Sequence, residues 1–176
     1  MSQLKLNAAF TIEVDIEIPL QVHQGKSIFN VPSGELIDSK NNNVLGELLG
    51  PSGDWLEIQP SGTMNLNIRD AFKLENGHNL LATITGRSVP NEVVVPKMEN
   101  GSLVSGDEMY FVHSLLMETD SEKYNWVNDR VFLGQMTELT MPSEVPTRIS
   151  YDVFVIGYEA HGDGQGAVGN RVTHHV

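Results

Sequence analysis

Three charged side chains in this sequence are candidates for acid–base or polarising chemistry: Asp54, Arg69 and Glu118. A carboxyl group can pass protons to and from a bound molecule. A guanidinium group can hold a carboxylate or phenolate through two parallel hydrogen bonds. None of the three belongs to a compact motif that dictates one reaction, so their value depends on whether the fold directs them into one cavity.

Arg69 has two interpretations that the sequence leaves open. It lies in an alternating run in which Asn65, Asn67, Arg69 and Lys73 share one face, while Met64, Leu66, Ile68, Phe72 and Leu74 share the other. If the polar face lines a barrel lumen, Arg69 and Asn67 could contact a ligand there. If that face meets solvent, Arg69 is an ordinary surface charge.

The two acids also have functional and structural interpretations. Asp54 is either a base or an arginine partner at a pocket mouth, or a cap for the Gly50–Gly53 turn. Glu118 follows three apolar residues, and burying its charge is costly unless it is paired. Its pair with Arg69, Arg87 or Arg130 would be a structural ion pair or an acid with a shifted pKa in a cleft.

The remaining candidates are aromatic and polar residues that could line a pocket. Each has a packing interpretation beside the ligand-binding one, and they are Trp55, Asn67, Tyr110, His113, Trp126 and Asn128.

Two glycine- or histidine-containing patterns near the end of the chain do not predict sites. Gly164–Gly169 matches a dinucleotide-binding fingerprint, but too few residues follow for the required helix and second strand. His161, His174 and His175 lack the spacing of a helical ligand pair. We therefore predict neither a metal site nor a cofactor.

These candidates depend on elements that read almost entirely as β-strands. Residues 10–18 alternate apolar and polar without a fault, and residues 53–59, 63–74 and 79–87 form an antiparallel meander joined by glycine-containing turns. Further strands are predicted at 108–119, 130–139 and 147–158, with one short helical turn at 121–128. Residues 88–107 read as a long loop with at most one strand.

Composition limits the classes of function. The 176 residues suit one β-domain over 1–160, followed by a flexible Gly- and His-rich tail over 161–176. A net charge of −12 disfavours nucleic acid and anionic membranes as partners, and the absence of cysteine excludes thiolate chemistry. The start of the chain lacks a signal-peptide pattern, so a cytoplasmic location is expected. Exposed apolar strips on a barrel would favour a homo-oligomer.

Short motifs in a fixed order resemble a known family. They include Gly50–Trp55, Pro60–Thr63, Asn67–Arg69, Tyr124–Asn128 and Val131–Gly134, and they resemble the uncharacterised domain-of-unknown-function family 3237 over about residues 6–158. The resemblance implies an antiparallel calycin- or lipocalin-like β-barrel of roughly eight to ten strands with at most a short helix. Relatives usually carry Asp where this chain has Asn67, and Arg in the motif that here contains His113, which puts borrowed acid–base chemistry in doubt.

The sequence therefore predicts a β-barrel that holds a small, apolar or aromatic molecule in its lumen. Two classes of function remain open. One is a cofactor-independent isomerase, cyclase or hydrolase, and the other is a non-catalytic ligand-binding or scaffold protein.

Overall fold

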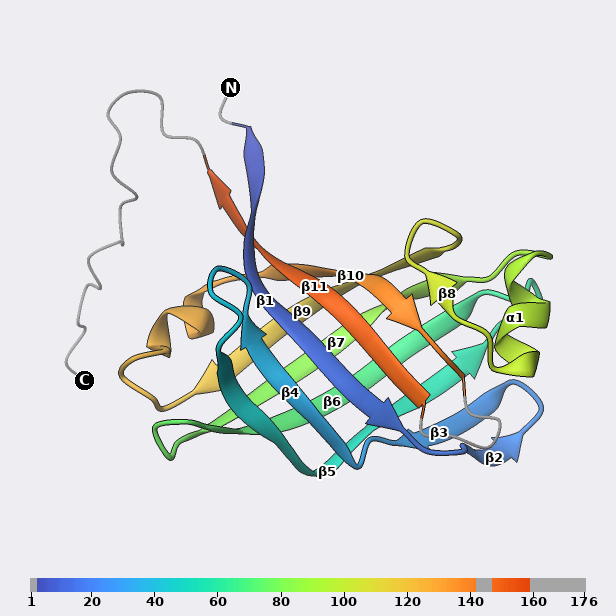
Figure 1. Ribbon diagram of the computed structural model, residues 1–176, viewed down its shortest axis with the longest axis horizontal. Helices are drawn as coiled ribbons and strands as arrows, with labels where there is room; N and C mark the ends of the chain where they lie inside the picture. Colours follow the sequence, from blue (N-terminus) through green and yellow to red (C-terminus); the bar gives the residue numbers. More distant parts are fainter. Residues whose placement is uncertain (1–2, 142–146, 159–176) are drawn as a thin grey trace, which may run out of the picture.

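The computed structural model describes residues 3–141 and 147–158, which form one antiparallel β-barrel (Figure 1). In chain order the elements are β1 (Leu4–Ile16), β2 (Leu20–His23), β3 (Lys26–Asn30), β4 (Ser33–Asp38), β5 (Val44–Ile58), β6 (Met64–Leu74), β7 (Asn79–Val89), α1 (Val94–Asn100), β8 (Val104–Ser105), β9 (Tyr110–Thr119), the 3₁₀ helix η1 (Asn125–Asp129), β10 (Phe132–Leu139) and β11 (Thr147–Tyr158).

Eight of these strands close the barrel in the order β5-β4-β1-β11-β10-β9-β7-β6, because β6 pairs with β5 again. The predicted fold class is thereby confirmed. The predicted tail at 161–176, with the Gly164–Gly169 pattern and His161, His174 and His175, lies outside the described residues. No helix among the described residues is long and apolar enough to cross a membrane.

The meander from β5 to β7 follows the alternation in the sequence. Gly62 and Gly77 occupy the turns with φ of 85° and 86°, a left-handed conformation that glycine adopts without a Cβ clash. β6 turns Leu66, Ile68 and Phe72 into the core and leaves Arg69 and Lys73 outside. The sequence left open whether the polar or the apolar face of this strand is inside. In the structure the apolar face is inside, and Arg69 is a surface charge.

β5 is longer than the sequence pattern indicates. In the sequence a short apolar run at 44–49 is separated by the glycine- and proline-containing residues 50–53 from the strand predicted at 53–59. In the structure the two form one strand, which pairs first with β4 and then with β3. The ladder to β6 is irregular between Leu49 and Gly53. There the Ser52 hydroxyl donates to the Leu49 carbonyl at 2.6 Å and accepts the Ala71 N–H at 3.1 Å. A side chain thus replaces the lost backbone pairing.

The two ends of the barrel carry different short helices. α1 lies within the segment predicted as a long loop, so that prediction is wrong for Val94–Asn100. The Asn91 side-chain oxygen accepts the N–H groups of Val93 and Val94, which supports the first turn of α1. The short turn predicted at 121–128 is the helix η1, slightly shifted along the chain. In Figure 1, α1 and η1 lie at opposite ends.

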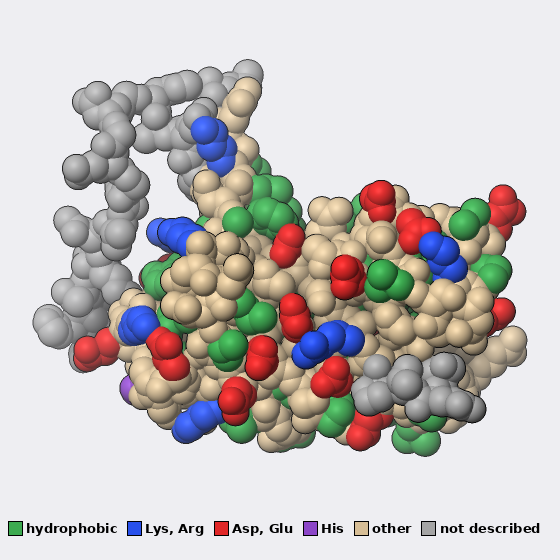
Figure 2. Space-filling model, in the orientation of Figure 1, with side chains coloured by type: hydrophobic (Ala, Val, Ile, Leu, Met, Phe, Trp, Pro, Cys, Tyr) green, Lys and Arg blue, Asp and Glu red, His purple; other side chains and the backbone are tan. Residues whose placement is uncertain are grey.

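Apolar side chains fill the interior, and charged groups cover the wall. Acidic and basic side chains are scattered among apolar ones on the face in Figure 2. Some are paired across strands, as Arg148 is with Glu13 at 3.6 Å and with Asp15 at 3.7 Å. The β1–β11 ribbon that extends beyond the barrel exposes Leu4 and Leu6 (Figure 1). Self-association stays a prediction.

Candidate functional site

A cavity of about 190 Å³ lies inside the barrel, toward the end that carries α1. Seven of the eight barrel strands, all except β4, contribute to its wall together with β3 and Met98 of α1. Most of the lining is apolar or aromatic, including Phe29 and Phe111. Its polar lining side chains are Ser27, Asp54, Asp70, Ser88 and Tyr151. A mostly apolar hollow with a few polar groups has the composition of a small-molecule site.

Asp70 is the most unusual side chain of this lining. It belongs to the inward-facing series of β6, between Ile68 and Phe72, and only 1% of its surface is exposed. Its Oδ1 atom has no hydrogen-bond partner among the residues that the structure describes. Burial, and to a smaller extent the neighbouring Asp54 carboxyl, together raise the pKa of Asp70 from 3.8 to about 7. Asp70 therefore holds its proton far above the normal range for an aspartate.

Asp54 lines the same cavity from β5 and is half-buried. Its Oδ1 accepts the backbone N–H of Asn67 at 2.9 Å, across the β5–β6 ladder. Burial raises the pKa of Asp54 to about 6, and the Asn67 N–H opposes that rise. The hydrogen bond to the ionised form leaves Asp54 the stronger acid of the pair.

Tyr151 and Ser88 add two hydroxyl groups to the polar part of the cavity, and Ser27, which donates to Gln21, adds a third. Tyr151 is fully buried on β11, and burial followed by the charges of Asp54 and Asp70 raises the pKa of its phenol well above 10. The Ser88 hydroxyl on β7 is buried without a partner. Both are hydroxyl groups that stay protonated at neutral pH and can donate a hydrogen bond to a ligand.

His113 is inside the barrel but behind the cavity wall. Its ring meets the ring of Tyr151 edge-on, with centroids 4.7 Å apart, and also contacts Phe111. Both ring nitrogens lack partners, and burial lowers the pKa of His113 to about 4, so the ring is neutral. Gly134 pairs with His113 across the sheet, and a Cβ on Gly134 would meet Nε2 at 2.0 Å. A glycine is therefore required beside this ring.

The other predicted site residues lie on the outer surface. Arg69 donates to the Asn67 side chain at 2.7 Å outside the barrel, and Trp55 is exposed on β5. Tyr110 is 58% exposed, and Trp126 of η1 stacks on Phe10 with ring centroids 5.7 Å apart. Of the predicted residues the structure brings only Asp54 to the cavity, with His113 behind it and Asn67 contributing its backbone N–H.

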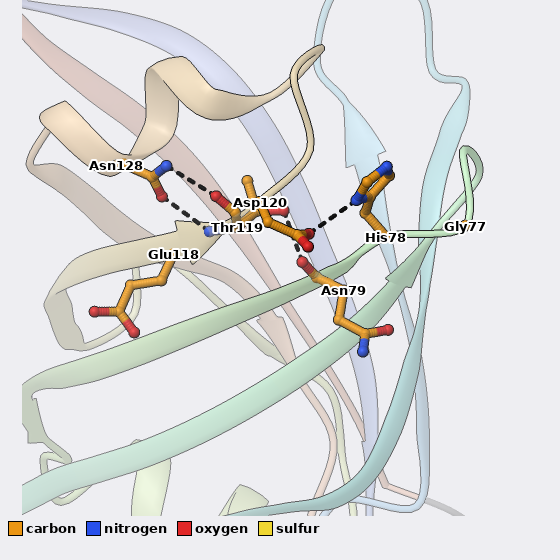
Figure 3. Close-up of a pocket in the computed structure, with 7 residues that line it drawn as sticks. All are labelled: Gly77, His78, Asn79, Glu118, Thr119, Asp120 and Asn128. Carbon is orange, nitrogen blue, oxygen red and sulfur yellow. Dashed lines mark hydrogen bonds and ion pairs between the residues drawn. The ribbon is translucent and has the colours of Figure 1, made fainter. Parts of the chain in front are cut away.

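Glu118 and Asn128 border a second, open hollow of about 690 Å³ at the opposite end of β9 (Figure 3). The Asn128 side chain donates to the Thr119 carbonyl and accepts the Thr119 N–H, each at 2.9 Å. His78 and Asp120 pair at 2.8 Å. Glu118 is exposed and points away from both pairs in Figure 3. Because Glu118 is exposed, the predicted burial of its charge is wrong, and no arginine among residues 3–141 and 147–158 is paired with it.

Asp70, Ser88 and Tyr151 line the cavity but were not among the residues predicted from the sequence. For Asp70 the signal was present, because period-two counting places it in the apolar series Met64, Leu66, Ile68, Phe72 and Leu74. An acid at an inward-facing position of a strand is a stronger indication of a site than an arginine on the polar face.

Solved structures of similar architecture support the fold. A conserved protein of unknown function from Rhodopseudomonas palustris matches 88% of this chain and 97% of its own chain, with a TM-score of 0.75 and 21% identity. A structure described as an enzyme from Penicillium herquei matches 86% of this chain and 94% of its own, with a TM-score of 0.52 and 17% identity.

Sequence comparison extends the likeness from fold to family. A UPF0311 protein from Clostridium acetobutylicum is 25% identical over 136 residues, which is 76% of this chain and 85% of that protein. The family model described as "Protein of unknown function (DUF3237)" matches residues 4–156. That match covers the whole barrel, and the chain therefore belongs to the DUF3237 family.

Proposed function

We propose that this protein binds a small apolar or aromatic molecule in the lumen cavity and exchanges protons with it through Asp54 and Asp70. The observation that carries the proposal is the buried Asp70 carboxyl, which faces the cavity with an oxygen that no group in the described part of the chain satisfies. A buried polar atom without a partner is unfavourable for the empty protein. A ligand that supplies the missing partner removes this cost.

The two acids suit opposite steps of a proton transfer. Near neutral pH, Asp54 with a pKa of about 6 is mostly ionised and can accept a proton. Asp70 with a pKa of about 7 keeps a substantial protonated fraction and can donate one. Removing a proton at one ligand atom and returning one at another leaves the proton count unchanged. This is the balance of an isomerisation or cyclisation, and it consumes no cofactor.

A non-catalytic binding protein is the second candidate function. The observation that favours it is the predominance of apolar side chains such as Leu56, Ile68 and Ile149 in the lining. Such a lining retains an apolar molecule without any reaction. The description of the Penicillium herquei neighbour as an enzyme favours turnover on this barrel, although the two chains share only 17% identity.

Native mass spectrometry of protein purified from its own source tests the shared part of both candidates. We expect a retained small molecule on the wild type and its loss in Ser88→Leu, which places a larger side chain in the cavity. Thr85→Leu is the matched control, because it adds a similar side chain on the outer face of the same strand. Equal retention by both variants would place the molecule elsewhere.

Deuterium exchange then separates catalysis from binding. The retained molecule is incubated with the protein in D₂O, and a proton-transfer enzyme should incorporate deuterium at carbon faster than buffer alone. We expect Asp54→Asn and Asp70→Asn to stop this exchange while the molecule still binds. Binding to the wild type with no acceleration of exchange would leave the non-catalytic function.

A further inference from the structure

The charged groups around the cavity are all of one sign. Among the described residues, those that line it include two carboxyl groups and no lysine, arginine or histidine. The acids lie close enough for the charge of Asp54 to raise the pKa of Asp70. Any negative charge held here therefore meets no compensating cation from the described part of the wall.

Strand alternation directs the nearest basic side chains outward. Arg69, Arg87 and Arg148 each follow or precede a cavity residue in sequence, and each lies on the outer wall. Arg69 is bonded to Asn67, Arg87 donates to the Gly86 carbonyl, and Arg148 is beside Glu13. None of them lines the cavity.

Two lysines near the cavity end are also engaged by acidic side chains. Lys26, next to the lining residue Ser27, pairs with Glu57 at 2.7 Å. Lys97, next to the lining residue Met98, pairs with Glu108. A positive charge that neutralises Asp70 therefore has to come from outside the described protein.

The aromatic part of the lining has a composition that suits a cation. Phe29, Phe111 and Tyr151 bring ring surfaces to the same cavity as the two acids. Aromatic faces attract ammonium groups through their quadrupoles, and the attraction is stronger in desolvated sites. The net charge of −12 also raises the local concentration of small cations around the protein.

From this arrangement we propose that the natural ligand of the lumen is a small apolar or aromatic amine, whose ammonium group lies against Asp70 and Asp54. This inference rests on the proposed lumen-binding function and specifies its substrate class. The ammonium N–H groups donate to the unpartnered Asp70 Oδ1, and the hydrocarbon part packs against Leu66, Ile68 and Phe111. A carboxylate ligand is repelled by the same groups.

Three probes of the same shape test the charge preference: 2-phenylethylamine, 2-phenylethanol and phenylacetate. Isothermal titration calorimetry at pH 7.5 should give an amine affinity at least 10-fold above that of the alcohol, with no binding of phenylacetate. Methyl NMR locates the binding, with shifts expected at Ile68 and Ile149 in the cavity and none at Ile37 on β4, which does not line it.

Matched variants identify the acid responsible. Asp70→Asn should reduce amine affinity to that of the alcohol and leave alcohol affinity unchanged, and Asp54→Asn should reduce the preference for the amine by a smaller factor. Glu118→Gln removes an acid from the outer surface and should change nothing. Using both Asp variants keeps the test valid if one of them folds poorly.

The possible outcomes distinguish failure of the amine inference from failure of the proposed lumen-binding function. Equal affinities for amine and alcohol at the lumen methyls would overturn the amine class and leave lumen binding intact. An amine preference that persists in both Asp variants, or that appears without shifts at the lumen methyls, would show binding to the acidic surface and would also overturn it. Absence of lumen shifts with all three probes would overturn the inference and the proposed lumen-binding function together.

Discussion

The lumen cavity and the open hollow at the opposite end of β9 differ in what their polar groups do. In the open hollow bordered by Gly77–Asn79 and Glu118–Asp120, Asn128 bonds Thr119 twice and His78 pairs with Asp120 (Figure 3). In the lumen cavity, Asp70 and Ser88 each present a buried oxygen that has no partner. These polar groups of the open hollow therefore satisfy one another's hydrogen-bonding capacity, whereas Asp70 and Ser88 in the lumen cavity keep theirs unmet among the described residues.

This difference shows which hollow is built for a ligand. Polar groups that satisfy one another hold a loop and a helix in place, and solvent can replace any bond they lose. A buried acid in an apolar wall lowers stability and is retained in a fold only where something else depends on it. Unmet hydrogen-bonding capacity in a confined space is thus a better indication of function than the size of a hollow.

The largest expected effect is on the pH dependence of the free energy of unfolding, and it tests the difference between the lumen cavity and the open hollow. The pKa of Asp70 is 3.8 when unfolded and about 7 when folded, so between these values the folded state binds more protons. Its stability therefore falls as the pH rises from about 4 to 7. A shift of one pKa unit corresponds to ~1.4 kcal/mol. The free energy of unfolding of Asp70→Asn should therefore rise by roughly 4 kcal/mol relative to that of the wild type over this range.

Urea unfolding of both proteins from pH 4 to pH 8 measures that difference. Asp120→Asn in the open hollow is the control, and its pH profile should run parallel to that of the wild type over this range. His78 holds the pKa of Asp120 below 3.8, so the contribution of Asp120 to stability is present throughout pH 4 to 8 and is lost only on further acidification. Parallel pH profiles for wild type and Asp70→Asn would show that Asp70 ionises freely and would break the comparison.

The next effect concerns the packed interior behind the cavity. Gly134→Ala would place a Cβ 2.0 Å from Nε2 of His113, and the ring is held between Phe111 and Tyr151. We expect a loss of ~1–3 kcal/mol in the free energy of unfolding, typical of overpacking. In a protein that already carries His113→Ala, Gly134→Ala should reduce the free energy of unfolding by less than it does in the wild type. Additive costs would mean that the ring moves aside easily and that this part of the lumen is loose.

The smallest effect belongs to the open hollow. Asn128→Ala removes two hydrogen bonds to the Thr119 backbone, and water can replace both because the site is exposed. We expect a loss of about 1 kcal/mol or less in thermal or chemical unfolding. Retention of the lumen ligand should not change. A variant that folds normally but no longer retains the ligand would connect the two hollows and contradict the separation between them.

Several parts of the fold could be predicted because they depend on local pattern. Alternation in β1 and β6 specified which residues share a face, and Gly62 and Gly77 specified the turns. α1 was not predicted, because its support comes from Asn91 rather than from a helical period. β5 was divided in two, because the Ser52 hydroxyl bridges an irregularity that resembles a turn in the sequence.

The candidate site was less predictable than the fold. Asp54 was identified, whereas Arg69, Glu118 and Tyr110 proved to lie outside the cavity. For Arg69 the sequence left open which face of its strand lines the lumen, and the structure places the apolar face there. Asp70 was missed because a single acid in an apolar series resembles an exception to a pattern rather than a site.

The sequence by itself determined that this chain forms short antiparallel strands, because the two-residue period and the positions of glycine act within a few residues. Only the tertiary structure decided which face of each strand is inside, because that choice minimises exposed apolar surface over the whole closed barrel. It also placed Asp70 and Asp54 beside one cavity, since their proximity arises from the register of β5 against β6.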